Sequence, residues 1–195
     1  MIELQTFDDL SEATIPDGIP PVRLTRLKID STTGASTSLV VFPPGWRRDV
    51  TGSYAASEDF LVIAGSLNVS GIRLGAGDLG GIPAGALRWS SFTEEPTRTL
   101  AWFSGAGNWA PSSEDTATRP TWRLASRHLG SADGVSLPTD GQDGQRAEIR
   151  LGPFEAAVGS EIVNLDTFTW FEVDAEHRAI GPGRFLIRWS YSAND

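Results

Sequence analysis

Short strand-like runs recur along the chain, separated by glycine or proline. Most alternate apolar with polar residues, and Phe60–Ile63 is apolar throughout. In the first half, such runs lie at Val22–Ile29, Ser36–Phe42, Phe60–Ile63, Leu67–Ile72 and Arg98–Phe103. Alternation over short runs bounded by turn residues is typical of β-strands in a sandwich or barrel. The best helix candidate is a single turn near Thr6–Ala13. The pattern therefore predicts an all-β fold.

The second half continues the same pattern. Strand-like runs lie at Trp122–Ser126, Ala147–Leu151, Glu161–Leu165, Phe168–Val173 and Phe185–Trp189. It also echoes the first half, because Ser57–Glu58 precedes Arg88–Ser90 much as Ser160–Glu161 precedes Arg188–Ser190. We predict that residues 1–110 form a barrel with N-terminal strands. Residues 111–195 then form either a degenerate second copy of it or a strand extension of the same barrel.

The stretch between Gly45 and Phe92 carries the most specific signal. Its first half reads Gly45, five residues, Thr51, Gly52, Ser53, four residues, Glu58, six residues and Gly65. Its second half reads Gly77, five residues, Pro83, one residue, Gly85, two residues, Arg88, three residues and Phe92. Both spacings resemble the two sequence motifs of the cupins, which are small jelly-roll β-barrels. The resemblance implies a cupin jelly-roll barrel, and the echo in the second half is similar to the two-repeat cupins of ChrR-type anti-sigma factors, with an eroded second repeat.

The positions that hold a metal ion in the cupins carry other residues in this chain. The family uses three histidines and one glutamate, and the matching positions here are Thr51, Ser53, Glu58 and Arg88. An arginine has no lone pair to offer a metal, and a site without several imidazoles binds transition metals poorly. We therefore expect no bound metal and no other cofactor. Instead, Glu58 and Arg88 are predicted to form an ion pair inside the barrel.

Two functions remain open for such a barrel. In the first, it is an enzyme that binds a small, largely apolar organic molecule and performs isomerase, cyclase or lyase chemistry. Glu58 would move a proton, and Arg88, together with Thr51, Ser53 or Tyr54, would stabilise the negative charge that develops on an oxygen. In the second, it is a non-catalytic binding or interaction protein in which Glu58 and Arg88 form a structural cross-link. The candidate substrate-binding residues are Thr51, Ser53, Trp46, Phe60 and Trp102.

Composition narrows the range of partners. The net charge of −9 argues against nucleic acid and against anionic membrane surfaces, because both are bound through an excess of Lys and Arg. The chain has no cysteine, which excludes disulfides and zinc–thiolate sites, and its two histidines, His128 and His177, lie outside the motifs in polar surroundings. No secretory signal or membrane-length apolar segment is visible, so we expect a cytoplasmic protein. The resemblance to cupins also implies a homodimer.

Overall fold

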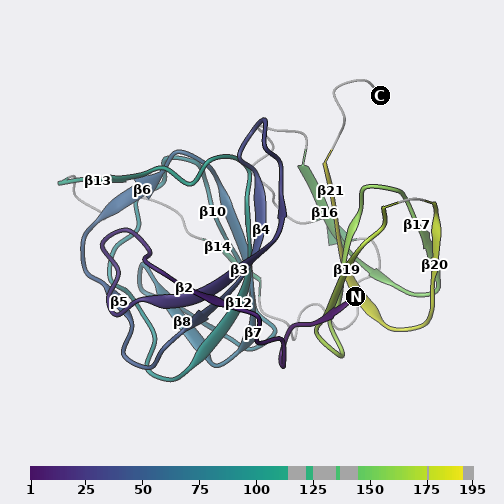
Figure 1. Cartoon of the computed structure of the whole chain (residues 1–195), viewed down its shortest axis with the longest axis horizontal. Helices are drawn as coiled ribbons and strands as arrows, with labels where there is room; N and C mark the ends of the chain where they lie inside the picture. Colours follow the sequence, from purple (N-terminus) through teal and green to yellow (C-terminus); the bar gives the residue numbers. More distant parts are fainter. Residues whose placement is uncertain (114–121, 125–134, 137–144, 175, 191–195) are drawn as a thin grey trace. The chain divides into compact units, whose positions relative to one another are not determined.

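A computed structural model describes residues 1–113, 122–124, 135–136, 145–174 and 176–190 (Figure 1). These residues form antiparallel strands, turns and loops, which confirms the all-β prediction. The described chain has no helix that combines the length and apolar character needed to cross a membrane. The chain divides into two compact units, which we call the large unit (Asp8–Ser126) and the small unit (Met1–Phe7 with Arg127–Asp195).

The prediction of a helical turn over Thr6–Ala13 is wrong at its C-terminal end. Ser11–Ala13 form an edge strand, β2, which pairs with Val22–Leu24. That pairing satisfies backbone groups that a short polar segment cannot satisfy as an isolated turn of helix. A helix-like turn does occur, but earlier, where the backbone N–H of Phe7 donates to the carbonyl of Glu3 at 3.0 Å.

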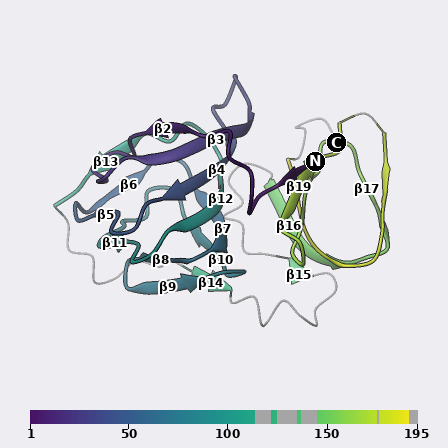
Figure 2. The same cartoon turned by 60° about the horizontal axis from the view of Figure 1, so that its bottom comes forward.

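The large unit consists of two main antiparallel sheets. Its strands are β2 (Ser11–Ala13), β3 (Val22–Ile29), β4 (Ser36–Phe42), β5 (Arg47–Arg48), β6 (Gly52–Tyr54), β7 (Glu58–Ala64), β8 (Ser66–Val69), β9 (Ile72–Gly75), β10 (Leu79–Ile82), β11 (Ser91–Phe92), β12 (Thr97–Phe103), β13 (Trp109–Pro111) and β14 (Trp122–Leu124). One sheet has the order β14-β10-β7-β12-β4-β3-β2, and the other has the order β5-β11-β8-β9. Strands β6 and β13 form a separate pair. Figure 2 shows the arrangement from a second direction.

The core of the large unit lies between these sheets. Phe42, Phe60 and Val62 extend into it from the seven-stranded sheet, and Leu67 and Leu74 from the four-stranded one. Side chains point to opposite faces at successive positions of a strand, so each of these residues has a neighbour that faces away from the core. In β7 the neighbours Leu61 and Ile63 are also apolar and buried, so this strand appears in the sequence as a continuous apolar run.

The small unit repeats part of this strand order. Its strands are β1 (Ile2–Glu3), β15 (Val135–Ser136), β16 (Gln145–Leu151), β17 (Phe154–Ala156), β18 (Glu161–Asn164), β19 (Thr169–Glu172), β20 (Arg178–Ile180) and β21 (Arg184–Ser190). They form a sheet with the order β1-β19-β18-β21-β16-β15 and a pair, β17-β20. Within it, the order β19-β18-β21-β16 corresponds to β10-β7-β12-β4 of the large unit. This order is what a second, shortened copy of the first fold would have.

The structure corrects one part of the sequence echo. Arg188 lies directly opposite Glu161 on adjacent strands, whereas the residue opposite Glu58 in the corresponding strand pair is Phe103. Arg188 therefore occupies the position of Phe103 and not that of Arg88. The spacing in the sequence aligned two arginines that have different places in the sheets.

Candidate functional site

A cavity of about 440 Å³ opens between the two sheets of the large unit. Much of its wall is apolar, with contributions from Val40, Phe42, Phe60, Leu67 and Ile82. Ligand sites in proteins are commonly clefts of several hundred Å³ with apolar walls and a few well-placed polar groups. The size and the lining of this cavity fit that description.

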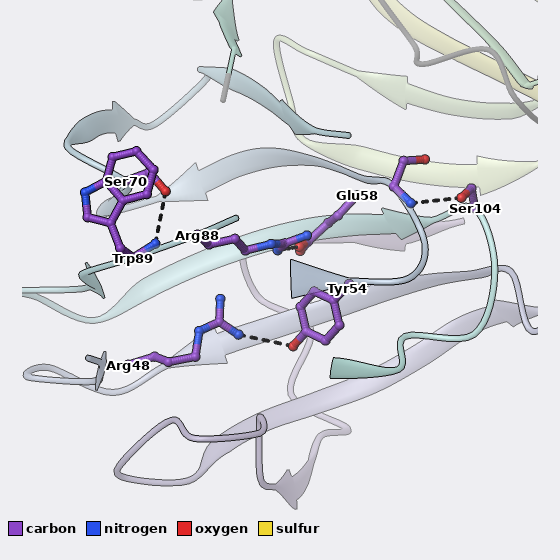
Figure 3. Close-up of polar contacts among 8 residues, drawn as sticks. Arg48, Tyr54, Glu58, Ser70, Arg88, Trp89 and Ser104 are labelled. Carbon is purple, nitrogen blue, oxygen red and sulfur yellow. Dashed lines mark hydrogen bonds and ion pairs between the residues drawn. The ribbon is translucent and has the colours of Figure 1, made fainter. Parts of the chain in front are cut away.

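A cluster of four polar side chains lies on the wall of the cavity: Arg48, Tyr54, Glu58 and Arg88 (Figure 3). Arg88 Nη1 donates to Glu58 Oε2, which confirms the predicted ion pair. Arg88 is 3% exposed and the Glu58 side chain 16% exposed. The guanidinium of Arg88 also lies over the ring of Tyr54, 4.5 Å from its centroid. The ion pair is thus held inside the fold and not at its surface.

Arg48 is the second cation of the cluster. It is 4% exposed, and its Nη1 donates to the hydroxyl of Tyr54 at 3.3 Å. Its guanidinium lies 4.0 Å from the centroid of the ring of Trp109, the first residue of β13, which pairs with β6. Figure 3 shows the side chains of Arg48 and Arg88 extending toward Tyr54 and Glu58. Burial lowers the pKa of the Arg48 guanidinium, because it removes water from the charged form.

Short strands determine which of these side chains face the cavity. Trp46 and Arg48 line it while Arg47, between them, is exposed, as the alternation of a strand requires. In β7, Glu58 and Phe60 line the cavity in the same way. Arg88 is positioned by its backbone, since its N–H donates to the carbonyl of Gly52 at 2.8 Å and its carbonyl accepts from the N–H of Gly52 at 3.1 Å.

Five of the eight residues predicted for the site line the cavity: Trp46, Tyr54, Glu58, Phe60 and Arg88. Thr51, Ser53 and Trp102 do not line it. In β6, Ser53 alternates with Tyr54, so only Tyr54 faces the cavity. In β12, Ala101 and Phe103 line the cavity, and Trp102 is buried on the opposite face of the sheet. The hydroxyl groups at two of the histidine positions therefore do not line this cavity.

Sequence reasoning missed Arg48. It lies in the spacer after Gly45, next to a second arginine, where a pair of solvent-exposed charges is the common arrangement. The available signal was its position two residues after Trp46, which places both side chains on one face of a strand. Of the two histidines, His177 is exposed, and His128 lies outside the described residues.

We expect the phenol of Tyr54 to ionise above its ordinary pKa of 10.0, because burial raises the pKa of this group. The unfolded chain then loses this proton first, so the free energy of unfolding falls as pH rises above 10.0. The chain has two tyrosines, and the difference in phenolate absorbance between wild type and Tyr54→Phe isolates Tyr54. A midpoint at or below the ordinary value would contradict the buried environment of this ring.

No protein-family model and no curated protein matches the sequence. Solved structures do match it. A candidate dioxygenase from Nostoc punctiforme PCC 73102 is 20% identical with a TM-score of 0.68, and the match covers 99% of this chain and 86% of that chain. A variant of salicylate 1,2-dioxygenase from Pseudoaminobacter salicylatoxidans is 14% identical with a TM-score of 0.54, covering 86% of this chain and 76% of that one. The fold is that of the cupins. At these identities the similarity shows the cupin fold alone.

The cupin fold commonly holds a divalent metal ion, but the residues of this site do not fit one. Among the described residues, Glu58 is the only carboxylate that lines the cavity, and His177 is not part of its lining. Across the described part of the chain, no group of three or more His, Cys, Asp or Glu side chains is arranged to hold a metal. The two guanidiniums have no lone pair and repel a cation. The side chains that line this cavity therefore differ in chemical type from the ligands of a transition-metal site.

Proposed function

We propose that the cavity binds a small, largely apolar organic molecule and that Glu58 performs acid–base chemistry on it. The observation that supports this function is a carboxylate, two guanidiniums and a phenol gathered on the wall of an otherwise apolar cavity. Acid–base and electrostatic groups held in a site of low polarity stabilise charge without first having to reorganise. Isomerisation, cyclisation and elimination all run on such groups.

Each group has a role in this proposal. Glu58 Oε2 accepts the hydrogen bond from Arg88, and Oε1 is the oxygen that exchanges a proton with the substrate. Removal of a proton from a carbon beside a carbonyl moves negative charge onto the carbonyl oxygen. Arg48 or Tyr54 donates a hydrogen bond to that oxygen. The proton then returns from Glu58 to another atom of the substrate, which completes an isomerisation.

A second candidate function is binding without catalysis. The ion pair of Glu58 and Arg88 is complete in itself, and it accounts for both side chains as a cross-link between β7 and the segment that follows β10. In that case the cavity is a receptor for the molecule and Glu58 contributes to the fold alone. The two candidates differ in what a conservative change at Glu58 does.

We expect Glu58→Gln to abolish proton transfer while leaving the cavity intact, because glutamine keeps the shape and the bond to Arg88 but is no base. The assay is deuterium incorporation next to the carbonyl of phenylacetone, 2-indanone and 2-tetralone in D₂O, followed by NMR. The wild type should accelerate exchange of at least one ketone, and Glu58→Gln should lower that rate about 100-fold or more. Glu94→Gln, an exposed change of equal charge, is the control. Equal rates in wild type and Glu58→Gln would support binding without catalysis.

A further inference from the structure

Buried hydrogen-bond donors without a partner gather on the wall of the cavity. Among the described residues, Trp46 Nε1, Arg88 Nε, Arg88 Nη2 and Ser91 Oγ are buried and make no hydrogen bond, and all three residues line the cavity. The three nitrogens are donors only, and a hydroxyl can donate as well. Buried polar groups in native proteins are normally hydrogen-bonded, so unpaired donors on a cavity wall indicate an occupant that accepts.

The charges on the wall point to an anion. Among the described residues, three arginines line the cavity, the exposed Arg26 and the buried Arg48 and Arg88, and Glu58 is the only acidic residue that does. Glu58 accepts from Arg88, while the hydrogen bond of Arg48 goes to the neutral hydroxyl of Tyr54. The hydrogen bond and the ring contacts of Arg48 go to neutral groups, and Glu58, the carboxylate that attracts it, is already paired with Arg88. The described wall therefore holds more positive than negative charge.

We propose that the molecule bound in the cavity is an organic carboxylate and that its carboxylate group binds Arg48 and the free edge of Arg88. This inference rests on the proposed function and names its substrate class. The planar fork of a guanidinium matches the two oxygens of a carboxylate, which makes this pair stronger and more directional than a contact with a neutral amide. The apolar side chains of Phe42, Phe60 and Leu67 then surround the hydrocarbon part. An aromatic or branched aliphatic acid fits both parts of the wall.

The test compares acids with their neutral amides by isothermal titration calorimetry at fixed ionic strength. The probes are benzoate, phenylacetate and cinnamate against benzamide, phenylacetamide and cinnamamide. We expect at least one acid to bind about tenfold or more tightly than its amide in the wild type. Arg48→Met should remove this preference, and Arg47→Met, the exposed neighbour, should keep it. Acids that bind no better than their amides, or a preference that survives in Arg48→Met, would overturn the proposal.

Stability separates a ligand-binding role of Arg48 from a structural one. Arg48→Met removes a buried charge and leaves no carboxylate unpaired, so the thermal midpoint without ligand should be no lower than in the wild type. A structural role predicts a lower midpoint and unchanged discrimination between acids and amides. Inorganic phosphate that binds as tightly as the best acid would also overturn the proposal, because the apolar wall would then contribute nothing.

The ketone exchange assay and the acid–amide comparison can fail separately. Glu58-dependent exchange of ketones without a preference for acids would uphold the proposed enzyme and reject the carboxylate. Preference for acids without Glu58-dependent exchange would uphold the carboxylate site and reject the catalytic role of Glu58.

Discussion

Arg88→Met is expected to lower the free energy of unfolding of the large unit by about 3–5 kcal/mol. Arg88 Nη1 donates to Glu58 Oε2, and the Glu58 side chain is only 16% exposed. Methionine fills much of the space but leaves the carboxylate inside the fold without its cation. An unpaired buried charge costs far more than the net stabilisation that the pair provides. Urea unfolding followed by tryptophan fluorescence and by circular dichroism measures the loss.

A double variant shows whether the stability lost in Arg88→Met comes from the broken ion pair or from lost packing. Glu58→Gln combined with Arg88→Met removes both charges, so the double variant should recover most of the stability lost by Arg88→Met alone. Arg23→Met is the control within the same unit, because its ion pair with Asp8 is exposed and should be worth less than about 1 kcal/mol. A double variant as unstable as the single one would show that Arg88 stabilises the fold by its packing, as over the ring of Tyr54.

The long strands could be predicted from the sequence because each is a run rich in apolar residues bounded by turn residues. In β7 and β12 most side chains are buried on one face of the sheet or the other, so each strand appears in the sequence as a short run rich in apolar residues. The Glu58–Arg88 pair could also be predicted, since the motif spacing placed both residues at positions that face the interior. The information lies within single strands in the first case and within two short motifs in the second.

The parts that could not be predicted depend on short strands and distant neighbours. Strand β6, Gly52–Tyr54, has three residues and no apolar alternation, so its sequence does not say which side chains face inward. The structure points Tyr54 to the cavity and leaves Ser53 outside its lining. The burial of Arg48 depends on Trp109, a residue far along the chain whose ring covers the guanidinium. The sequence around Arg48 cannot indicate a contact with a residue so distant in the chain.

Gly65→Ala is expected to lower the free energy of unfolding by about 2–5 kcal/mol, because two separate effects act at this position. Gly65 connects β7 to β8 with a φ of +74°, in the left-handed region where a Cβ is strained. A Cβ there would also press on the carbonyl oxygen of Pro96 and lie 2.7 Å from Thr97 Oγ1. That hydroxyl accepts from the N–H of Ser66 at 3.2 Å and donates to the carbonyl of Ser66 at 2.9 Å. The new methyl group would disturb both bonds.

Gly85→Ala separates the backbone effect from the crowding. Gly85 has a similar φ of +71°, but no atom lies within 4 Å of the position where its Cβ would be. Its replacement should therefore cost only the backbone strain, about 1–2 kcal/mol. Chemical unfolding gives the free energy of unfolding of both variants. The difference between them is the cost of crowding at Gly65, where the chain lies close to Pro96 and to β12. Equal losses would mean that the chain at Pro96 moves aside, and that the crowding at Gly65 does not contribute to the stability of the fold.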